Sequence, residues 1–293
     1  MQKKKLKLGY SISLPLDYNN EIPEYVTDNI KSIIMDAKKF ECIQIMFSKS
    51  KLSSQQIREI KSILKKYKHI YVHASYQINI GADLIPSNTD LYSTGIEIFL
   101  NEIDWANKIG AKGIVIHMGK NVKNRYDPAH IYNNMVKFIV ELFKKLQNKQ
   151  KTKQINIHVL LETPAGQGGE MCWNLKEFVE FIVGFSKLYF YPQLGVCLDT
   201  CHIFQAGWDL NNSKIIKQVH QILLPIQDKI KLIHLNDSYH LVGSHIDRHE
   251  QIGKGHIQTD KLVKFIYPYK HIPMILETVG PYDEQIENLS NIK

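Results

Sequence analysis

The chain has 293 residues, of which 44% are hydrophobic and 23% are charged, and its lysines and arginines exceed its aspartates and glutamates by 37 − 29 = 8. A chain of this length and composition can bury a substantial core, and the lack of an apolar run of about 18 residues argues against a membrane-spanning protein. The basic excess modestly favours an anionic partner such as nucleic acid.

The cysteines and the first residues bear on the cellular compartment. Cys42, Cys172, Cys197 and Cys201 show neither C-x-x-C spacing nor the density of a disulfide-rich protein, which favours free thiols in a reducing compartment. The opening residues, MQKKKLKLGYS, are basic but include neither the apolar segment nor the cleavage site of a secretion signal. We therefore expect an intracellular protein that is not secreted.

Eight short apolar runs rich in β-branched residues alternate with longer amphipathic stretches. In chain order they are LKLGYSI (6–12), ECIQIMF (41–47), HIYVHAS (69–75), KGIVIHM (112–118), INIHVLLET (155–163), LGVCLDT (194–200), IKLIHLN (230–236) and IPMILET (272–278). The stretches between them, such as residues 96–110 and 128–147, carry apolar residues every three or four positions, which is the period of a helix. Eight alternations without a composition break predict one α/β domain over residues 1–293, folded as a single (β/α)8 TIM barrel. A doubly wound open sheet is the alternative.

Six of the eight runs end at or near a side chain of a type that binds metal ions: His73, His117, Glu162, Asp199, His234 and Glu277. Singly, such a histidine is more often hydrogen-bonded within a core, and an acidic residue after a strand more often caps a helix. The whole set is harder to explain this way, because buried carboxylates and imidazoles are costly unless they are paired or bind metal. In a barrel the carboxyl ends of the strands converge on one face, where barrel enzymes have their active sites.

Two further segments add residues of the same types near this face. The segment GSHIDRHEQIGKG (243–255) follows the seventh run and contributes Asp247 and His249, and His202 follows the sixth run in DTCH. The nine residues comprise five imidazoles and four carboxylates, a set that suits zinc or a similar divalent ion at catalytic sites. Nine ligands are too many for one ion, so we expect a cluster of two or three ions that share a bridging carboxylate. The segment PAGQGGEM (164–171) lacks the phosphate-binding patterns of P-loops and Rossmann turns, and we interpret it as a flexible loop.

Seven segments resemble the endonuclease IV family of apurinic/apyrimidinic DNA-repair nucleases, within the xylose isomerase-like TIM barrels. They are VHASYQINIGA, VIHMGK, LLETPAGQGGEM, GVCLDTCHIFQAGWDL, LIHLNDS, SHIDRHEQIGKGHI and ILETVG, and they follow the family order over most of the chain. The most specific of them are CLDTCHIFQAGWD and DRHEQIGKG, whereas ILET alone carries little weight.

The resemblance implies that the nine residues bind three zinc ions, with manganese as the alternative at some of these sites. Three ligand groups follow from it: His73, His117 and Glu162 for the first ion; Glu162, Asp199, His234 and Glu277 for the second; His202, Asp247 and His249 for the third. Glu162 is then the catalytic residue, because the bridging carboxylate would orient the attacking nucleophile.

The resemblance also implies a base excision repair enzyme that hydrolyses the phosphodiester 5′ to an abasic site in double-stranded DNA. The products would be a 3′-OH and a 5′-deoxyribose phosphate, and 3′ blocking groups would be removed by the same chemistry. For the DNA contacts it indicates Tyr76, Gln77, Lys49, Lys51 and Arg248. The chain departs from the family at Gln77, where an apolar residue is commoner, and in its first run, which lacks the usual histidine. We expect a monomer.

Two other functions fit part of this pattern. A sugar isomerase of the xylose-isomerase-like barrels also has carboxylates and histidines at strand ends, but His202, Asp247 and His249 would have no role in it. A damaged-DNA sensor that has lost its chemistry predicts degraded ligands, whereas all nine are present. Cleavage of abasic DNA distinguishes the nuclease from both alternatives.

Overall fold

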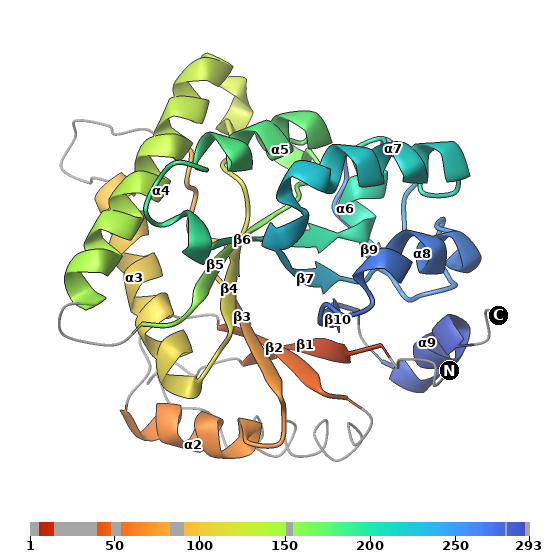
Figure 1. Cartoon of the computed structure of the whole chain (residues 1–293), viewed down its shortest axis with the longest axis horizontal. Helices are drawn as coiled ribbons and strands as arrows, with labels where there is room; N and C mark the ends of the chain where they lie inside the picture. Colours follow the sequence, from red (N-terminus) through yellow and green to blue (C-terminus); the bar gives the residue numbers. More distant parts are fainter. Residues whose placement is uncertain are drawn as a thin grey trace.

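Eight parallel strands close into a barrel in the order β1-β10-β7-β6-β5-β4-β3-β2, which confirms the predicted TIM barrel (Figure 1). The computed structural model describes residues 6–14, 40–47, 54–82, 91–150, 155–278 and 280–290. The barrel strands are β1 (Leu8–Leu14), β2 (Cys42–Phe47), β3 (His69–His73), β4 (Gly113–Ile116), β5 (His158–Glu162), β6 (Leu194–Asp199), β7 (Ile230–His234) and β10 (Met274–Leu276). Each of them lies within or overlaps one of the eight apolar runs, so the open-sheet alternative is wrong.

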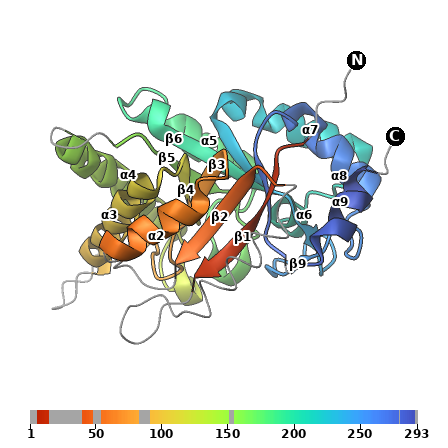
Figure 2. The same ribbon diagram turned by 90° about the horizontal axis from the view of Figure 1, so that it is seen from below.

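Helices surround the strands. They are α2 (Ser54–Leu64), α3 (Leu91–Ile109), α4 (Pro128–Gln150), α5 (Leu175–Gly184), α6 (Thr200–Gln205), α7 (Ser213–Leu223), α8 (Thr259–Ile266) and α9 (Tyr282–Ser290). Short 3-10 segments lie between them: η1 (Val122–Asn124), η2 (Gln167–Gly169), η3 (Tyr191–Gln193), η4 (Leu224–Lys229) and η5 (Tyr267–Tyr269). In Figure 2, α2, α3 and α4 lie on one flank of the barrel and α7, α8 and α9 on the other.

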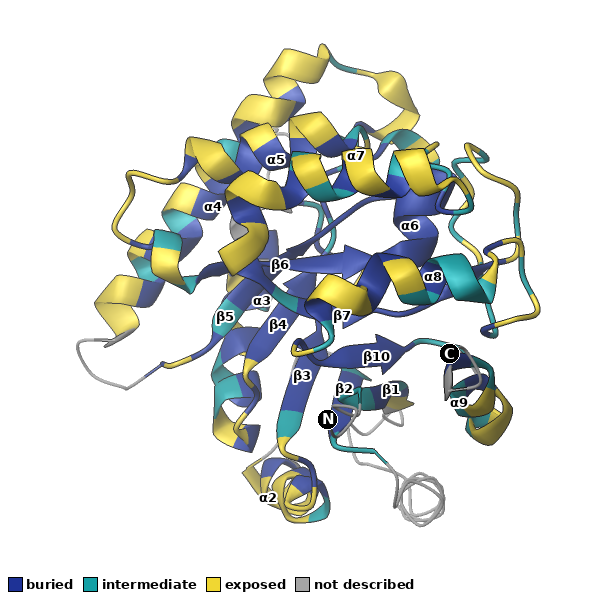
Figure 3. Cartoon of the chain, turned by 45° about the vertical axis from the view of Figure 1, so that its right-hand side comes forward, coloured by how far each residue is buried: buried dark blue, intermediate teal, exposed yellow. Residues whose placement is uncertain are grey.

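The outer helices each bury one face against the strands, as their amphipathic sequences predict (Figure 3). In α7 the buried residues are Ile216, Val219 and Leu223, whose spacing of three and four places them on one side of the helix. A glycine follows the end of α3. Its last residue is Ile109, and Gly110 then adopts a left-handed φ of +84°, a conformation that glycine accepts without steric cost.

A layer of apolar side chains fills the barrel interior. Seven strands contribute one residue each, namely Cys42, Tyr71, Val115, Leu160, Cys197, Leu232 and Ile275. All seven are almost fully buried. Because side chains alternate along a strand, the residue two positions further on also points into the barrel, one layer nearer the carboxyl ends. This layer is therefore the floor on which the next set of inward side chains rests.

A two-stranded antiparallel ribbon, which the sequence did not predict, follows β7. Its strands β8 (Asp237–Ser238) and β9 (His249–Glu250) pair Ser238 with His249, which returns the chain to the end of the barrel strands. Strands of two residues carry no periodicity from which they could be predicted. Within the described ranges, the structure has no helix that is long and apolar enough to cross a membrane.

Candidate metal centre

The strand-end residues identified in the sequence form the layer directly above the apolar floor. His73 stands two positions after Tyr71, and Glu162 stands two positions after Leu160. Each of the other strand-end residues likewise stands two positions after a residue of the floor. The residues at this step are Gln44, His73, His117, Glu162, Asp199, His234 and Glu277. Six of the seven are predicted ligands, and the seventh, Gln44, was not predicted.

The first group of possible ligands consists of His73, His117 and Glu162. Glu162 Oε2 lies 3.4 Å from Nε2 of His73 and 3.5 Å from Nε2 of His117, and it is buried without a hydrogen-bond partner. On His73, Nδ1 lies 2.8 Å from the carbonyl oxygen of Ala74, which can only accept, so Nδ1 carries the hydrogen and Nε2 has a lone pair. The lone pair of His73 and the carboxylate of Glu162 therefore face each other, with Nε2 of His117 beside them, across a gap that a cation can fill.

The second group consists of Glu162, Asp199, His234 and Glu277. Nδ1 of His234 lies 2.7 Å from Glu162 Oε1, 3.1 Å from Glu277 Oε2 and 3.7 Å from Asp199 Oδ2. Asp199 also caps α6, since its Oδ1 accepts from the backbone N–H of His202 at 2.8 Å. The helix-cap interpretation of this aspartate and the metal-ligand interpretation are thus compatible, because each uses a different carboxylate oxygen.

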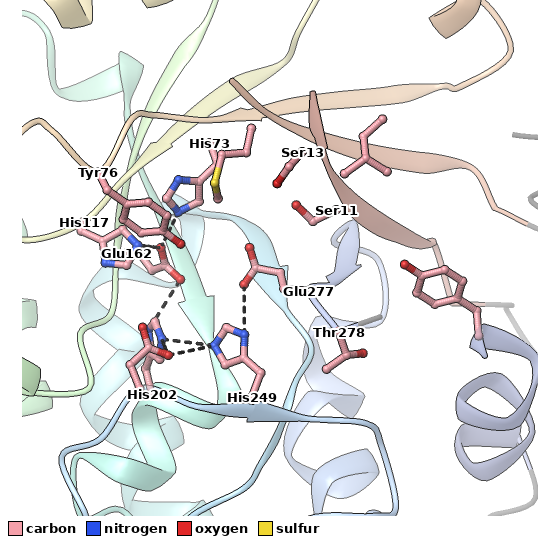
Figure 4. A pocket seen from close by; sticks show the side chains of 14 residues that line it. Ser11, Ser13, His73, Tyr76, His117, Glu162, His202, His249, Glu277 and Thr278 are labelled. Atoms are coloured by element: carbon pink, nitrogen blue, oxygen red, sulfur yellow. Dashed lines mark hydrogen bonds and ion pairs between the residues drawn. The ribbon is translucent and has the colours of Figure 1, made fainter. Parts of the chain in front are cut away.

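The third group joins His202 on α6 with Asp247 and His249 from the ribbon. Asp247 Oδ1 lies 3.1 Å from His202 Nε2 and 3.3 Å from His249 Nε2, and the two Nε2 atoms are 3.3 Å apart. His202 Nδ1 donates to the carbonyl oxygen of Thr163 at 2.9 Å, which leaves Nε2 free for a ligand. All nine predicted residues thus come together in three groups, of which the first two share Glu162 and the third adjoins them. Figure 4 labels six of the nine, namely His73, His117, Glu162, His202, His249 and Glu277.

Within this cluster, carboxylates and imidazoles each stabilise the charged form of the other. Burial acts against the charged form of His202, but the carboxylates of Asp199 and Asp247 outweigh it and hold the pKa of His202 well above its usual value. Burial likewise acts against the Glu162 carboxylate, yet neighbouring imidazoles, chiefly His234, hold the pKa of Glu162 well below its usual value. Cations and protons would therefore compete for the same imidazole nitrogens.

Imidazole and carboxylate donors fit a zinc-like divalent ion better than the nearby thiols do. Cys197 and Cys201 lie close to members of the cluster, but burial raises the pKa of the Cys197 thiol to about 12 and also raises that of Cys201. Because the thiolate is the form that binds metal, an ion would have to displace a tightly held proton to bind either cysteine. The unpartnered Oε2 of Glu162 and the lone pairs directed at it are the features that match a bound cation.

The loop that carries the third group is held by Asp237, which was not predicted as a site residue. Its two carboxylate oxygens accept four backbone N–H groups, those of Ser238, Gly253, Gly255 and Ile257, at 2.7 to 3.1 Å. A Cβ at Gly255 would lie 2.5 Å from Asp237 Oδ1, so this position needs glycine. The glycines of QIGKG thus belong to a structural turn around a buried carboxylate.

We expect Asp237→Asn to lower the free energy of unfolding by about 2 to 4 kcal/mol, because an amide can accept at only one of its two terminal atoms and leaves two N–H groups unpaired. Urea denaturation measures this loss, and limited proteolysis should show faster cutting between residues 249 and 257. The exposed Asp228→Asn is the matched control and should change stability by at most about 0.5 kcal/mol. Equal stability of the two variants would show that Asp237 does not hold the loop.

Glu170 is a second residue that the sequence interpretation missed. It lies in PAGQGGEM, which we interpreted as a flexible loop, but its side chain is buried and accepts from the backbone N–H groups of Gly166 and Gln167. Its Oε1 is 3.7 Å from Nδ1 of His117 and 3.2 Å from Nζ of Lys120. The segment is therefore an ordered support for a histidine of the first group. The alternation of glycine and a single acidic residue gave no signal of this contact.

A pocket of about 410 Å³ opens above the cluster. Members of the three groups line one side of it, and Ser11, Ser13 and Thr278 line another, as Figure 4 shows. Tyr76 lies at its rim, 69% exposed, with its ring centroid 5.5 Å from that of His73 and 5.4 Å from that of His117.

Two of the other residues predicted to contact DNA lie on the surface. Gln77 and the side chain of Arg248 are exposed. The carbonyl of Arg248 accepts from Gln205 and from the backbone of Tyr239. Lys49 and Lys51 lie outside the described residues.

The loop that carries Tyr76 is anchored by Glu102 of α3. This carboxyl is 1% exposed and accepts from the backbone N–H of Ser75 at 3.1 Å. Burial raises the pKa of Glu102 to about 7, with a smaller opposing effect of that hydrogen bond.

Glu102→Gln is expected to change how stability depends on pH. The folded protein binds the proton of Glu102 more tightly than the unfolded chain does, so this stabilisation is complete below pH 4.5 and is lost as the pH rises through 7. Relative to wild type, the free energy of unfolding of Glu102→Gln should therefore rise by on the order of 3 kcal/mol over this range. Denaturant titrations at several pH values test this, with the exposed Glu97→Gln on the same helix as control. A difference from wild type that stays constant with pH would contradict the assignment.

Two sequence comparisons indicate the family of the chain. The profile of the family described as "Xylose isomerase-like TIM barrel" matches residues 36–292. The probable endonuclease 4 of Mesoplasma florum is 34% identical over 307 residues, which cover 98% of this chain and 97% of that protein.

Solved structures resemble the chain in fold. Endonuclease IV from Thermus thermophilus has a TM-score of 0.69 at 21% identity, covering 97% of this chain and 96% of that one. A D-tagatose 3-epimerase-like protein has a TM-score of 0.68 at 17% identity, covering 97% and 98%. Since the fold is shared almost equally by both, the sequence relationship and the site have to discriminate between them.

Proposed function

Because this chain belongs to the endonuclease IV family of the xylose isomerase-like TIM barrels, we propose that it is a DNA-repair endonuclease acting at abasic sites in double-stranded DNA. One observation carries the proposal. The nine imidazoles and carboxylates divide into three groups around one pocket, and the third group comes from α6 and the ribbon, where an isomerase with one or two metal ions would not need it. A phosphodiester backbone is also consistent with the basic excess of the chain.

We infer that the three groups hold three divalent ions and that these ions are zinc. The first would be held by His73, His117 and Glu162, the second by Glu162, Asp199, His234 and Glu277, and the third by His202, Asp247 and His249. When bound, such ions supply positive charge for a DNA phosphate and lower the pKa of water towards ~7.

The proposed reaction breaks the bond between phosphorus and the O3′ of the nucleotide that precedes the abasic sugar. The oxygen of a water molecule bonds to phosphorus, and one proton of that water ends on O3′, which gives a 3′-OH and leaves the phosphate on the abasic sugar. Glu162 is suited to orient the water, because its Oε2 lies at the pocket and accepts no hydrogen bond from the described part of the chain. The same chemistry would remove blocking groups from a 3′ end.

Selectivity for damage would follow from the pocket and its rim. An abasic sugar has no base to unstack, so it can be extruded into a pocket at lower cost than an intact nucleotide. Tyr76 and Gln77 are exposed beside the opening and would contact the distorted DNA, while the exposed guanidinium of Arg248 would contact a phosphate. We also propose that Lys49 and Lys51 contact DNA phosphates.

The test is cleavage of a labelled duplex that carries one tetrahydrofuran abasic analogue, with metal content measured on the same preparation. The analogue cannot undergo β-elimination, so a cut on its 5′ side is hydrolytic. We expect this cut, together with close to three metal ions per chain. An intact duplex, combined with turnover of a sugar, would refute the nuclease and support an isomerase on the same barrel.

A further inference from the structure

Gln44 on β2 is fully buried and makes its hydrogen bonds inside the proposed metal cluster. Its Nε2 donates to Glu277 Oε1 at 2.7 Å and to Ser11 Oγ at 3.3 Å. Its Oε1 lies 2.8 Å from Nε2 of His234. The carboxylate of Glu277 accepts, so the amide nitrogen of Gln44 must face it, and this sets the amide oxygen towards His234.

This arrangement determines which nitrogen of His234 carries the hydrogen. An amide oxygen can only accept, so Nε2 of His234 donates to it. In the neutral ring Nδ1 then has the lone pair, and Nδ1 is the atom that faces Glu162 and Glu277. One glutamine therefore sets both the tautomer of His234 and the position of Glu277, two members of the second group.

The geometry points to Gln44 as a positioning residue that presents His234 Nδ1 and Glu277 to the same ion. The inference rests on the proposed function, since it assumes that the second group binds a metal. Among natural side chains of this length, glutamine combines an acceptor for His234 with a donor for Glu277. Contacts that orient ligands in this way commonly change metal affinity about 10- to 100-fold when they are removed.

Gln44 is more open to testing than the other contacts that orient the imidazoles. His73 and His202 donate to backbone carbonyls, those of Ala74 and Thr163, which no side-chain substitution removes. Gln44 is paired in register with Ser11 of β1, whose short side chain leaves the amide within reach of β7 and the end of β10. A substitution at Gln44 therefore isolates the effect of a single support on a single group.

The first experiment compares wild type with Gln44→Met, which is similar in length but has no polar group. Zinc binding is titrated in metal buffers of graded free concentration. We expect one of three sites to weaken by about 10- to 100-fold while the other two keep their affinity. The control Gln285→Met removes another fully buried amide, one that accepts from Ile252 and Thr278, and it should leave all three affinities unchanged. Unchanged affinity at all sites of Gln44→Met would overturn the inference.

The second readout does not need metal. In the metal-free protein, at a pH high enough for the ring of His234 to be neutral, ¹⁵N–¹H correlation spectra of the histidine side chains report its tautomer. We expect the Nε2–H form in wild type and a mixture of tautomers in Gln44→Met, and an unaltered tautomer would overturn the inference. If the wild-type protein bound no zinc, the proposed function would be refuted. The tautomer of His234 would still show whether Gln44 positions this ring. Should Gln44→Met not fold, Gln44→Glu keeps the acceptor and should keep the Nε2–H form, whose loss would contradict the inference.

Discussion

Replacing Glu162 by glutamine is expected to reduce cleavage of abasic DNA by at least about 1000-fold, equivalent to about 4 kcal/mol of transition-state stabilisation. The reason is that the Glu162 carboxylate belongs to both the first and the second group. One oxygen lies 2.7 Å from Nδ1 of His234, and the other faces His73 and His117 at 3.4 and 3.5 Å. Glutamine has nearly the same shape but no charge, and it can present only one acceptor oxygen, so a bridging role cannot be kept.

Single-turnover cleavage of the tetrahydrofuran duplex measures this effect, and a gel-shift assay checks that DNA binding remains. The matched control is Glu250→Gln, which makes the same chemical change beside His249. The Glu250 side chain accepts from the neighbouring backbone N–H of Gln251 and is not a member of any of the three groups. Its activity should stay within about tenfold of wild type, or about 1.4 kcal/mol. If Glu162→Gln cleaved as fast as this control, the bridging assignment would be wrong.

Removal of the metal should abolish cleavage, and the ions should leave at different rates. In the third group Asp247 and His249 have side chains that are 25% and 19% exposed, whereas Glu162 and His73 are each 2% exposed. Brief treatment with EDTA should therefore extract the third ion first, and prolonged strong chelation should extract all of them. Because ions that bind only the folded protein stabilise it, the thermal midpoint should fall too. Each ion whose free concentration is 100 times its Kd adds roughly 3 kcal/mol to the free energy of unfolding, and this contribution is lost on removal.

Metal content, cleavage rate and thermal midpoint measured on the same time points test this order. Added zinc should restore all three, which separates loss of metal from irreversible unfolding. Cleavage that persists undiminished in fully stripped protein would refute metal catalysis. Simultaneous loss of all ions would contradict the difference in accessibility between the groups.

The barrel and the clustering of the nine residues can be predicted from the sequence because both follow from short repeats. Each strand is an apolar run, and in six runs a metal-type residue stands two positions after the floor residue, as Glu162 does after Leu160. Gln44 stands in the same relation to Cys42, so the register could have indicated it. It was missed because an amide is not a typical ligand and the second run has no charged end.

The roles of the remaining site residues depend on contacts between segments far apart in the sequence. The periodicity of apolar residues gives no information about such contacts. Asp237 is bound by backbone N–H groups up to 20 positions later in the chain, and Glu102 supports a loop 27 positions before it. The ribbon strands are also too short to show a pattern. Such residues can be found from a structure, where the number of donors around a buried carboxylate can be counted.

The place of β10 in the barrel bears on when the protein can become active during its synthesis. This strand closes the sheet between β7 and β1, and Glu277 directly follows it. Its partners in the second group lie on β5, β6 and β7, which leave the ribosome earlier. A nascent chain can thus assemble the first and third groups while the second is incomplete. Loading of the second ion would therefore report that β10 has closed the barrel, so a chain without β10 and Glu277 would not complete this site.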